Sequence, residues 1–469
     1  MLFSSVTFLY AFLPATLLVY FLVPQRTDSP KGRNYVLLGA GMVFYAWGGL
    51  WYLVILAAQI IAAWGFGLAL ERLRGRPGFK TVFVASVGVS LSTLLCYKYT
   101  DFFIDNLNAL FGSDLPALKL LLPLGISFYT FQILSYLIDL YRGTIAVQRN
   151  LGTFATYVSL FPQLIAGPII RYADISEALT SRTHSIEDFA AGARRFVIGL
   201  AKKVILANTM GKLAATLGNT EHSSTLAAWG YLIAFALQIY FDFSAYSDMA
   251  IGLGRIFGFR FKENFNYPYI AVSITDFWRR WHISLSSWFR DYVYFPLGGS
   301  RVPIRRICLN LLLVWSLTGF WHGAAWNFIA WGGYFAVILI IEKFLLSGTL
   351  EKLPNWLTRC YTWLIVLIGW VFFDAGSLGG ALETLGALFG ANGVGADPTA
   401  WYHVESYALV LVMASIGATP LPTKAGKWLA ERYPKFAAVA EPVVLIGLLV
   451  LCTAFLVNST FNPFIYFRF

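Results

Sequence analysis

The sequence contains five histidines, and His322 is the one best placed to do chemistry. It lies in the run TGFWHGAAWNF (residues 318–328), between two long apolar stretches. A neutral imidazole accepts a proton near pH 7 more readily than other side chains do. An ionisable group within apolar chain usually faces a functional interior. These residues favour acid–base chemistry at His322. The alternative is a packing histidine that is hydrogen-bonded to a backbone carbonyl.

His282 is the second candidate, in a charged and aromatic stretch, SITDFWRRWHISLSSWFRDYVYFPLGG (residues 273–299). The wider range 255–306 holds nine Lys and Arg against three Asp and Glu, an excess of six. Tryptophans favour membrane interfaces, whereas charged side chains are costly in bare lipid. Four charged residues lie close to the histidine: Asp276, Arg279, Arg280 and Arg290. We predict a re-entrant or interfacial element that lines a polar cavity. An ordinary polar setting is the alternative for His282.

Other kinds of chemistry have little support in the sequence. No nucleophile elbow, Walker loop, dinucleotide-binding glycine pattern or zinc-protease motif occurs. The two candidate histidines have no Cys or Glu at ligand spacing, so no metal site is expected. Asp242 and Asp248 would point to nearly opposite faces of one helix, and we expect them to pair with nearby arginines instead of with each other. The remaining histidines lie in polar stretches and are expected at solvated surfaces: His184, His222 and His403.

The elements that position these residues must be membrane helices. Hydrophobic residues make up 58% of the 469 positions and charged residues 13%, against about 45–50% and about 25% in soluble domains. A single soluble core cannot hide that much apolar surface, because cores stop growing near roughly 250–300 residues. The excess must face lipid. The composition therefore predicts an all-α, polytopic integral membrane protein.

Hydropathy predicts about twelve crossings, that is, about 11–13 transmembrane helices. Residues 34–70 include no charged side chain. That run would make roughly 55 Å of helix, nearly twice a ~30 Å hydrocarbon core, so we predict two spans joined by a tight turn near residues 48–49. A short candidate at 361–375 is alternatively re-entrant. The other candidate spans lie near 6–23, 81–98, 118–140, 194–216, 225–248, 307–322, 326–345, 405–420 and 441–458.

Basic residues gather in alternate loops, which sets the expected orientation. Clusters lie in residues 26–33, 72–80 and 424–435, while the loops between them are acidic or neutral and hold residues such as Asp101, Asp105 and Glu221. The positive-inside rule places the basic loops in the cytoplasm and the amino terminus outside. The positive-inside rule therefore accounts for the net charge of +11. No nucleic-acid partner is expected.

One further segment breaks the simple hydropathy pattern. Helical spacing over residues 186–204 places Phe189, Phe196 and Leu200 among several charged side chains. This pattern predicts an amphipathic helix at the cytoplasmic face, ahead of a turn into the membrane. No linker and no segment long enough for a soluble domain occurs, so one membrane domain, 1–469, is expected.

Several long motifs resemble those of the membrane-bound O-acyltransferase family, and within it the alginate O-acetyltransferase (AlgI-type) branch. The resemblance covers nearly the whole chain, without a departure at the level of motifs. The matching stretches are MLFSSVTFLYAFLP, LGISFYTFQILSYLIDLYRG, FPQLIAGPIIRY, DFSAYSDMAIGLG, NYPYIAVSITDFWRRWHISLSSWFRDYVYFPLGG and WHGAAWNFIAWG.

The resemblance implies a fold, a reaction and partners. It implies helices around a central tunnel, no bound cofactor, acetyl-CoA as cytoplasmic donor, and an acceptor on the far side of a bacterial inner membrane. The family's catalytic histidine maps onto His322 and a second polar position onto His282, with Asp276 and Arg279 as supports. It also implies a periplasmic partner with a serine-hydrolase-like domain and an exopolysaccharide, alginate or related, as the final acceptor.

A mechanism follows from combining the resemblance with the residues. His322 would act as general base while an acceptor hydroxyl attacks the thioester. His282 or Asn327 would stabilise the oxyanion, and an acyl-histidine intermediate is the alternative route. The basic stretch, through Arg279 and Arg280, would attract the phosphates of coenzyme A.

Two rival functions stay open at this point. One keeps the fold but transfers D-alanine from a carrier protein to teichoic acid, as other members of the superfamily do. The other is a transporter, because buried His and Asp residues also suit transport, although no inverted repeat is evident. The choice of acceptor polysaccharide is not legible in the sequence.

Overall fold

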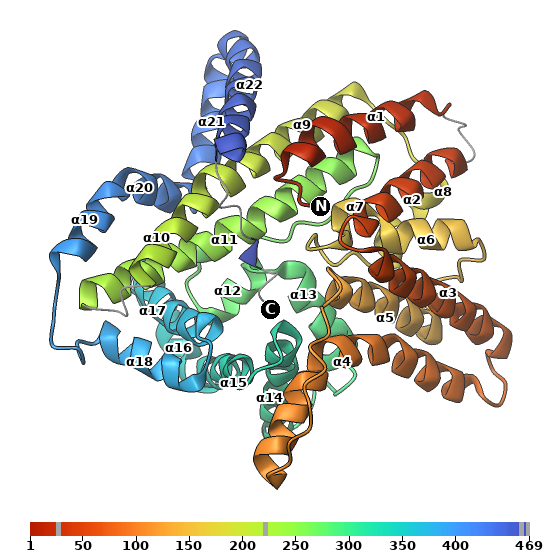
Figure 1. The fold of residues 1–469 in the computed structure, drawn as a ribbon, viewed down its shortest axis with the longest axis horizontal. Coiled ribbons are helices and arrows are strands. Elements are labelled where there is room, and N and C mark those ends of the chain that lie inside the picture. The colour runs from red at the N-terminus through yellow and green to blue at the C-terminus, as the bar shows by residue number, and fades with distance from the viewer. Residues whose placement is uncertain (25–29, 219–223, 459–463, 466–469) are drawn as a thin grey trace. The chain divides into compact units, whose positions relative to one another are not determined.

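The computed structural model describes residues 1–24, 30–218, 224–458 and 464–465 (Figure 1). Every element within these residues is helical, which confirms the all-α prediction. Contacts group the chain into two compact units: unit 1 comprises Met1–Phe196 and Met249–Lys262, and unit 2 comprises Val197–Asp248 and Glu263–Phe469. The single domain, the central tunnel and the orientation stay predictions. Three residues of the expected loops lie outside the described residues: Arg26, Glu221 and His222.

Unit 1 contains the amino-terminal helices and the end of α11, where η marks a π-helical or 3₁₀ segment. Its elements are η1 (Phe8–Phe12), α1 (Leu13–Leu22), α2 (Lys31–Ala46), α3 (Leu50–Leu73), α4 (Phe79–Phe111), α5 (Ile126–Arg142), α6 (Leu151–Ser159), α7 (Phe161–Leu164), α8 (Tyr172–Thr180) and most of α9 (Ile186–Ala201). Residues 34–70 form two helices, as predicted, and the turn between them uses Gly49 at φ 142°, a backbone conformation that favours glycine.

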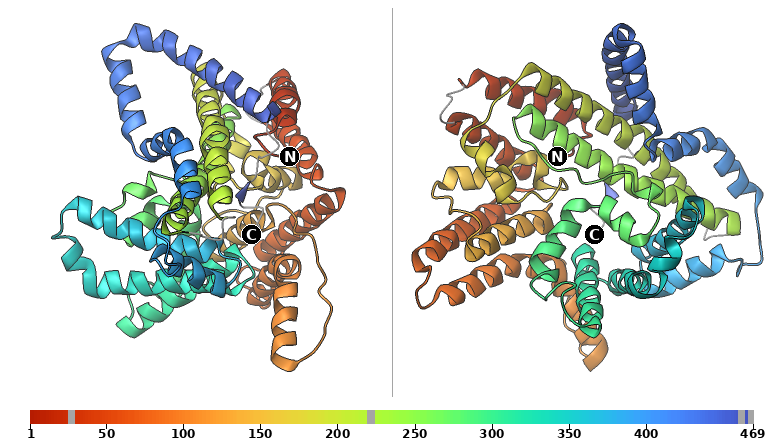
Figure 2. Two further views of the ribbon diagram at one scale, coloured as in Figure 1. Left: turned by 60° about the vertical axis from the view of Figure 1, so that its left-hand side comes forward. Right: turned by 180° about the vertical axis from the view of Figure 1, so that it is seen from behind.

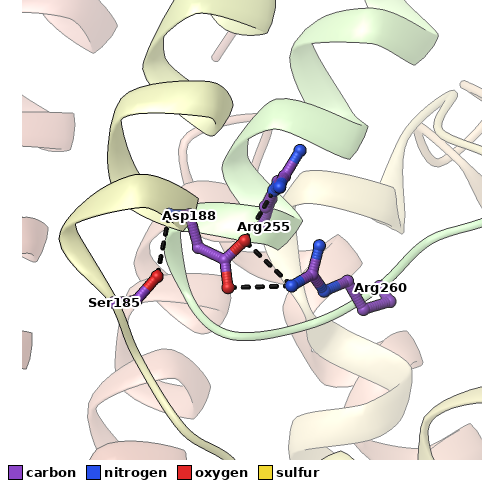
Figure 3. Close-up of polar contacts among 4 residues, drawn as sticks. All are labelled: Ser185, Asp188, Arg255 and Arg260. Carbon is purple, nitrogen blue, oxygen red and sulfur yellow. Dashed lines mark hydrogen bonds and ion pairs between the residues drawn. The ribbon is translucent and has the colours of Figure 1, made fainter.

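The amphipathic helix expected over residues 186–204 is α9. Ion pairs of Asp188 hold its first turn in place within unit 1. Asp188 accepts hydrogen bonds from Arg255 at the end of α11, at 2.9 Å, and from Arg260 just beyond it, at 2.8 Å (Figure 3). The backbone N–H of Asp188 donates to Ser185 Oγ at 3.0 Å, which satisfies one orphan amide of the helix start. The bond from Arg255 and the charge of Arg260 lower the pKa of the Asp188 carboxyl.

Glycines allow α9 and α11 to cross closely in unit 1. A Cβ atom added at Gly192 would lie 2.6 Å from the carbonyl oxygen of Gly252, and one at Gly252 would lie 2.6 Å from that of Gly192. Side chains larger than hydrogen would push the helices apart.

Unit 2 contains the remaining elements. They are η2 (Lys202–Ala207), α10 (Asn208–Gly218), most of α11 (Thr225–Ile256), η3 (Pro268–Ile270), α12 (Ile274–Arg280), α13 (Ile283–Phe289), η4 (Arg290–Tyr294), α14 (Ile304–His322), α15 (Trp326–Ile341), η5 (Glu342–Leu346), α16 (Ser347–Leu350), α17 (Asn355–Asp374), α18 (Leu378–Leu388), α19 (Pro398–Ser406), α20 (Ala408–Gly417), α21 (Leu421–Arg432) and α22 (Pro434–Asn458).

Helices α14 and α15 form the tightest pair of unit 2 and lie side by side in each view (Figure 2). A Cβ atom at Gly319 would lie 2.1 Å from the carbonyl oxygen of Phe328, and one at Gly332 would lie 2.2 Å from that of Trp315. Only glycine fits at both positions, because backbone atoms cannot yield as a flexible side chain does. This contact holds the end of α14, and with it His322, against α15.

Six helices of the described residues are long and apolar enough to cross a membrane: α3, α4, α11, α15 with its continuation to Leu350, α17 and α22. The bent pair α20 and α21 would make a seventh. A multi-pass protein is confirmed, but the predicted number of about twelve exceeds this count. Helix breaks shorten several predicted spans: α2 has 16 residues and α5 has 17, below the roughly 20 that a bilayer requires.

The two aspartates of α11 have partners other than those expected. Asp242 forms an ion pair of 2.6 Å with Lys203, and Asp248 forms one of 2.7 Å with Lys202. These ion pairs are formed with lysines, where arginines were expected from the sequence. Helix α9 continues through η2 alongside α11, so the nearest cations come from two successive lysines. Six residues at about 100° each place the two aspartates about 120° apart around α11, so each meets a different lysine.

Candidate active site

His282 lies where the helical chain is interrupted between α12 and α13. Its backbone is in the left-handed region, with φ 44° and ψ 53°, and it caps the start of α13. This conformation is costly for most side chains, although histidine is among those more often found there. The preceding helix α12 begins with Ser273, whose side chain accepts the N–H of Asp276 at 3.0 Å. Two short, capped helices therefore present His282 at their junction.

Asn264 holds this junction together. Its side-chain oxygen Oδ1 accepts the backbone N–H of Ser284 at 3.1 Å and the Ser284 hydroxyl at 2.9 Å, and lies 3.2 Å from Nδ1 of His282. Its amide nitrogen donates to Ser247 Oγ on α11 at 3.1 Å. Its backbone carbonyl accepts the N–H of Ile283 at 3.0 Å. Asn264 therefore ties the His282 junction to helix α11.

Aromatic rings pack against His282 beside Asn264 and Ser284. The side chain is 1% exposed. Phe243 meets the imidazole edge to face at 4.6 Å between ring centroids, and Phe265 stacks over it at 6.5 Å. His282 lies outside the helices that qualify as spans, and burial lowers its pKa to about 3, because a charged imidazolium loses its hydration there. The ring is therefore neutral near pH 7.

His322 is the last residue of α14 and is enclosed by aromatic rings. The centroids of Trp321, Trp331 and Phe373 lie 4.9, 5.1 and 5.2 Å from its own, each close to perpendicular. The side chain is buried, at 6% exposure. Aromatic neighbours from α15 and α17 therefore fix the plane of the ring, and the extended backbone at Gly323 ends the helix immediately after it.

Both histidines line one cavity of about 140 Å³ in unit 2. Trp321 bridges them, because its ring lies 6.2 Å from that of His282 and 4.9 Å from that of His322. The remaining walls come from α12, α13, η4 and α14: Trp278, Trp281, Leu285, Ser286, Phe289, Arg290, Tyr294, Leu311, Val314, Trp315 and Thr318. The cavity is thus mainly apolar, with two imidazoles on its wall.

A larger cavity of about 710 Å³ shares Tyr294 and Leu311 with the first. Its lining includes two cations, Arg279 and Lys343. It also includes the buried Glu342, whose carboxylate accepts the backbone N–H groups of Ile274 at 2.6 Å and Thr275 at 2.9 Å. A carboxylate in this position stabilises the amino-terminal end of α12. Unit 2 therefore has a small apolar cavity beside a larger polar one.

The other predicted donor-binding residues are distributed unevenly. Only Arg279 lines the larger cavity. Arg280 instead pairs with Asp276 one helical turn away, at 2.9 Å. Asn327 lines neither cavity, and its amide nitrogen donates to the carbonyls of Phe372 at 3.2 Å and Ala375 at 2.7 Å. Both amide hydrogens of Asn327 are engaged in that way, so in this arrangement it ties α15 to the end of α17.

Sequence reasoning missed two residues that organise the site. The importance of Glu342 could have been predicted, because an ionisable residue within an apolar run such as 326–345 usually has a functional or structural role. Asn264 offered no such signal, since a single asparagine in a polar connection is ordinary. The expected solvated position of His184 was also wrong: the ring is half-buried and has Tyr20 on one side and Arg33 on the other.

The arrangement suits proton transfer beside a small acyl group. Two buried imidazoles border one apolar cavity, and neutral imidazole can accept a proton from an attacking hydroxyl. No cluster of three or more His, Cys, Asp or Glu residues that could hold a metal occurs in the part of the chain that the structure describes. The chemistry that this geometry supports is therefore acid–base chemistry at a buried, mainly apolar site.

Comparison with known proteins defines the class. A model of the MBOAT, membrane-bound O-acyltransferase family, matches residues 145–373, which include both histidines. The chain belongs to this family and is a multi-pass membrane O-acyltransferase. Within the family it is of the AlgI type. It is 44% identical over 398 residues to the probable alginate O-acetylase AlgI of Azotobacter vinelandii, covering 83% of this chain and 78% of that protein.

Two relatives with other names show how far the similarity extends. A peptidoglycan O-acetyltransferase of Helicobacter pylori is 34% identical over 426 residues, which cover 84% of this chain and 81% of the relative. A teichoic acid D-alanyltransferase of Bacillus subtilis is 31% identical over 241 residues, which cover 49% of this chain and 61% of the relative. The match to the O-acetyltransferases therefore spans far more of the chain.

Proposed function

We propose that this protein transfers acetyl groups from acetyl-CoA, taken up at the cytoplasmic face of a bacterial inner membrane, toward hydroxyl groups of an extracytoplasmic polysaccharide. The observation that carries this proposal is the pair of buried imidazoles, His282 and His322, on the wall of one small apolar cavity. Acyl transfer to a hydroxyl requires a base within reach of the reacting group, in a site that excludes water.

The size of the cavity favours a short acyl group. A volume of about 140 Å³ is close to that of an engineered apolar cavity of about 150 Å³ that binds benzene. An acetyl group fits such a space with room for the attacking oxygen, whereas a long fatty acyl chain does not. Trp278 and Trp315, whose rings lie 4.7 Å apart, form a rigid part of the wall.

The larger cavity suits the anionic part of coenzyme A. Its volume of about 710 Å³ lies in the range of cavities that hold cofactor-sized molecules. Arg279 and Lys343 on its lining attract phosphate groups by charge, and Glu342 and Glu351 are on the same lining. The carboxylate of Glu342 is engaged by backbone N–H groups of Ile274 and Thr275. The two cavities share lining residues, so a thioester at the boundary would direct its acetyl group toward the histidines. Arg280 is paired with Asp276 and does not line this cavity.

In the proposed reaction His322 acts first as a general base and then as a general acid. The acceptor hydroxyl oxygen attacks the carbonyl carbon of the thioester, and its proton passes to His322. The carbon–sulfur bond breaks, and the leaving thiolate takes that proton from His322 to form free coenzyme A. The products are an acetyl ester and a thiol, and no other reactant is consumed. An acyl-histidine intermediate is the alternative that trapping with labelled acetyl-CoA would reveal.

The names of the relatives support the acceptor class. Alginate and peptidoglycan, named for two of them, are polysaccharides with free hydroxyl groups. We propose alginate or a related exopolysaccharide as the final acceptor, reached through a periplasmic partner that carries a serine-hydrolase-like domain. Passing only the small, neutral acetyl group through the membrane avoids moving the highly charged coenzyme A.

The proposal is tested with purified protein in nanodiscs and acetyl-CoA labelled in the acetyl group. Release of free thiol and transfer of label to an added polysaccharide, both lost in His322→Ala, are the expected results. A D-alanyl-charged carrier protein serves as the competing donor, and its use in place of acetyl-CoA would favour D-alanyl transfer. Absence of any thiol release, together with uptake of a solute into proteoliposomes, would favour a transporter.

A further inference from the structure

Asn264 determines which nitrogen of His282 carries the hydrogen. Its Oδ1 accepts the backbone N–H of Ser284, and a backbone N–H can only donate, so this atom is the amide oxygen and not the nitrogen. The same oxygen lies 3.2 Å from His282 Nδ1. Because a carbonyl oxygen can only accept, Nδ1 must be the protonated ring atom.

The other ring nitrogen follows from the charge state. His282 is neutral, since burial lowers its pKa to about 3. A neutral imidazole has one N–H and one lone pair. With the hydrogen on Nδ1, the lone pair is on Nε2, at the edge of the ring away from Asn264. From the sequence, His282 was expected to stabilise the oxyanion by donating a hydrogen bond. With its lone pair on Nε2, His282 cannot donate a hydrogen bond from that atom.

We infer that Asn264 is a positioning residue that holds His282 as the Nδ1–H tautomer, so that His282 acts on the reacting group as a hydrogen-bond acceptor. This inference rests on the proposed function. The lone pair on Nε2 favours a ligand that can donate a hydrogen bond, such as the attacking hydroxyl group. His322 remains the base, and His282 orients the hydroxyl toward the carbonyl carbon.

The geometry shows why an asparagine is needed for this task. Its oxygen serves His282 and Ser284 together, while its amide donates to Ser247 on α11. Its backbone carbonyl also binds Ile283, directly after the strained His282. A residue without both a donor and an acceptor would leave a buried polar group of α11 or α13 without its partner. The ring would also lose the bond that fixes its tautomer.

The direct test is the ¹⁵N spectrum of histidine-labelled protein in proteoliposomes, assigned by the signal that disappears in His282→Asn. We expect a protonated Nδ1 and an unprotonated Nε2 for that residue. A protonated Nε2 would overturn the inference. This measurement needs no turnover and no variant at position 264, so it decides the point even if Asn264 variants do not fold.

Kinetics supply the second test. Asn264→Ala should lower kcat by about 10- to 100-fold, with the KM for acetyl-CoA nearly unchanged, because the donor cavity does not include position 264. Asn264→Asp keeps an acceptor beside Nδ1 and should recover much of kcat. Its negative charge favours the imidazolium, so the acidic limb of its pH–rate profile should move to higher pH. Phe243, Phe265, Ser284 and Trp321 pack around the ring of His282, and the ionisable His322 and Arg290 line the same cavity.

Asn310→Ala is the matched control, since it removes another buried asparagine of unit 2, one that donates to the carbonyl of Leu297 and lines neither cavity. It should retain kcat within a few-fold and an unshifted pH profile. Wild-type kcat in Asn264→Ala would contradict the positioning role. Full transfer by both His322→Ala and His282→Asn would instead contradict the proposed function, and the ¹⁵N spectrum would still report the tautomer.

Discussion

His282 and His322 come from two different helix ends and border the same cavity. The ring of Trp321 lies 6.2 Å from that of His282 and 4.9 Å from that of His322. Their surroundings differ. His282 has a polar partner in Asn264 at 3.2 Å, whereas His322 is packed among three aromatic rings. The two imidazoles are therefore suited to different tasks, one orienting and the other exchanging a proton.

Replacement of His322 by alanine should abolish acyl transfer without unfolding the protein. A general base contributes about 10²- to 10⁴-fold, so thiol release from acetyl-CoA should fall by at least that lower factor. His403→Ala, in α19 and away from both cavities, is the control and should remain active. Size-exclusion profiles of both variants should match the wild type. Wild-type turnover in His322→Ala would rule out its role as base.

The small cavity should select for short acyl groups. We expect the rate to fall steeply from acetyl-CoA to butyryl-CoA, and Val314→Phe, which fills the cavity, to slow both donors. Trp315→Leu removes part of the wall and should raise the butyryl-to-acetyl ratio of kcat/KM. Leu317→Phe lies on the same helix but is 39% exposed and outside the lining, so it should leave that ratio unchanged. An unaltered ratio in Trp315→Leu would refute the assignment.

Arg279 should affect donor binding more than turnover. Losing one charge-assisted hydrogen bond of about 1.5 kcal/mol should raise the KM for acetyl-CoA roughly 10-fold in Arg279→Gln, with kcat almost constant. Arg305→Gln, an exposed basic residue outside the cavity lining, is the control and should show a smaller rise that disappears at high salt. Equal effects of the two substitutions would mean that only the general field of the basic segment matters.

The two ion pairs of α11 should contribute unequally to stability. Lys203 and Asp242 are 4% and 1% exposed, whereas Lys202 and Asp248 are 27% and 17% exposed. Breaking a buried pair costs about 3–5 kcal/mol, because the remaining charge has no compensation. Lys203→Met should therefore lower the midpoint of thermal aggregation in detergent much more than Lys202→Met does. Comparable midpoints for the two variants would contradict this ranking.

His184 should make unit 1 sensitive to acid. Arg33 donates to its Nδ1 at 3.2 Å, so Nε2 carries the hydrogen and donates to Tyr20 at 2.8 Å. Burial, followed by the charges of Arg33 and Arg182, lowers the pKa of His184 to about 4, and a hydrogen bond to the Phe257 backbone and the charge of Asp188 oppose this shift in part.

The sign of this effect follows from proton uptake. The unfolded chain, with a histidine pKa near 6.5, binds the proton first, so stability is complete above about pH 6.5 and falls as the pH drops toward 4. Thermal midpoints measured across this window should decline in the wild type and decline less in His184→Gln. Parallel curves for the two proteins would show that other groups dominate.

The fold class, two of the helices, the two candidate histidines and the family could all be predicted from the sequence. The apolar excess required membrane helices, because no soluble core can bury it, and the charge-free run of residues 34–70 gave both α2 and α3 with the turn between them. The rarity of ionisable groups in apolar chain singled out His322 and His282, and the motifs around them identified the family. These features are local or compositional, so they need no knowledge of which segments meet.

Other features depended on the tertiary structure. Helix breaks and the packing of each helix determine whether a long apolar stretch forms one full span, and hydropathy contains neither. Helix α5, for example, has only 17 residues and is almost wholly buried. The partners of Asp242 and Asp248 depended on which helix lies beside α11. Asn264, eighteen positions from His282, became meaningful only when the fold brought its oxygen to the ring, because the direction of one hydrogen bond assigns the tautomer.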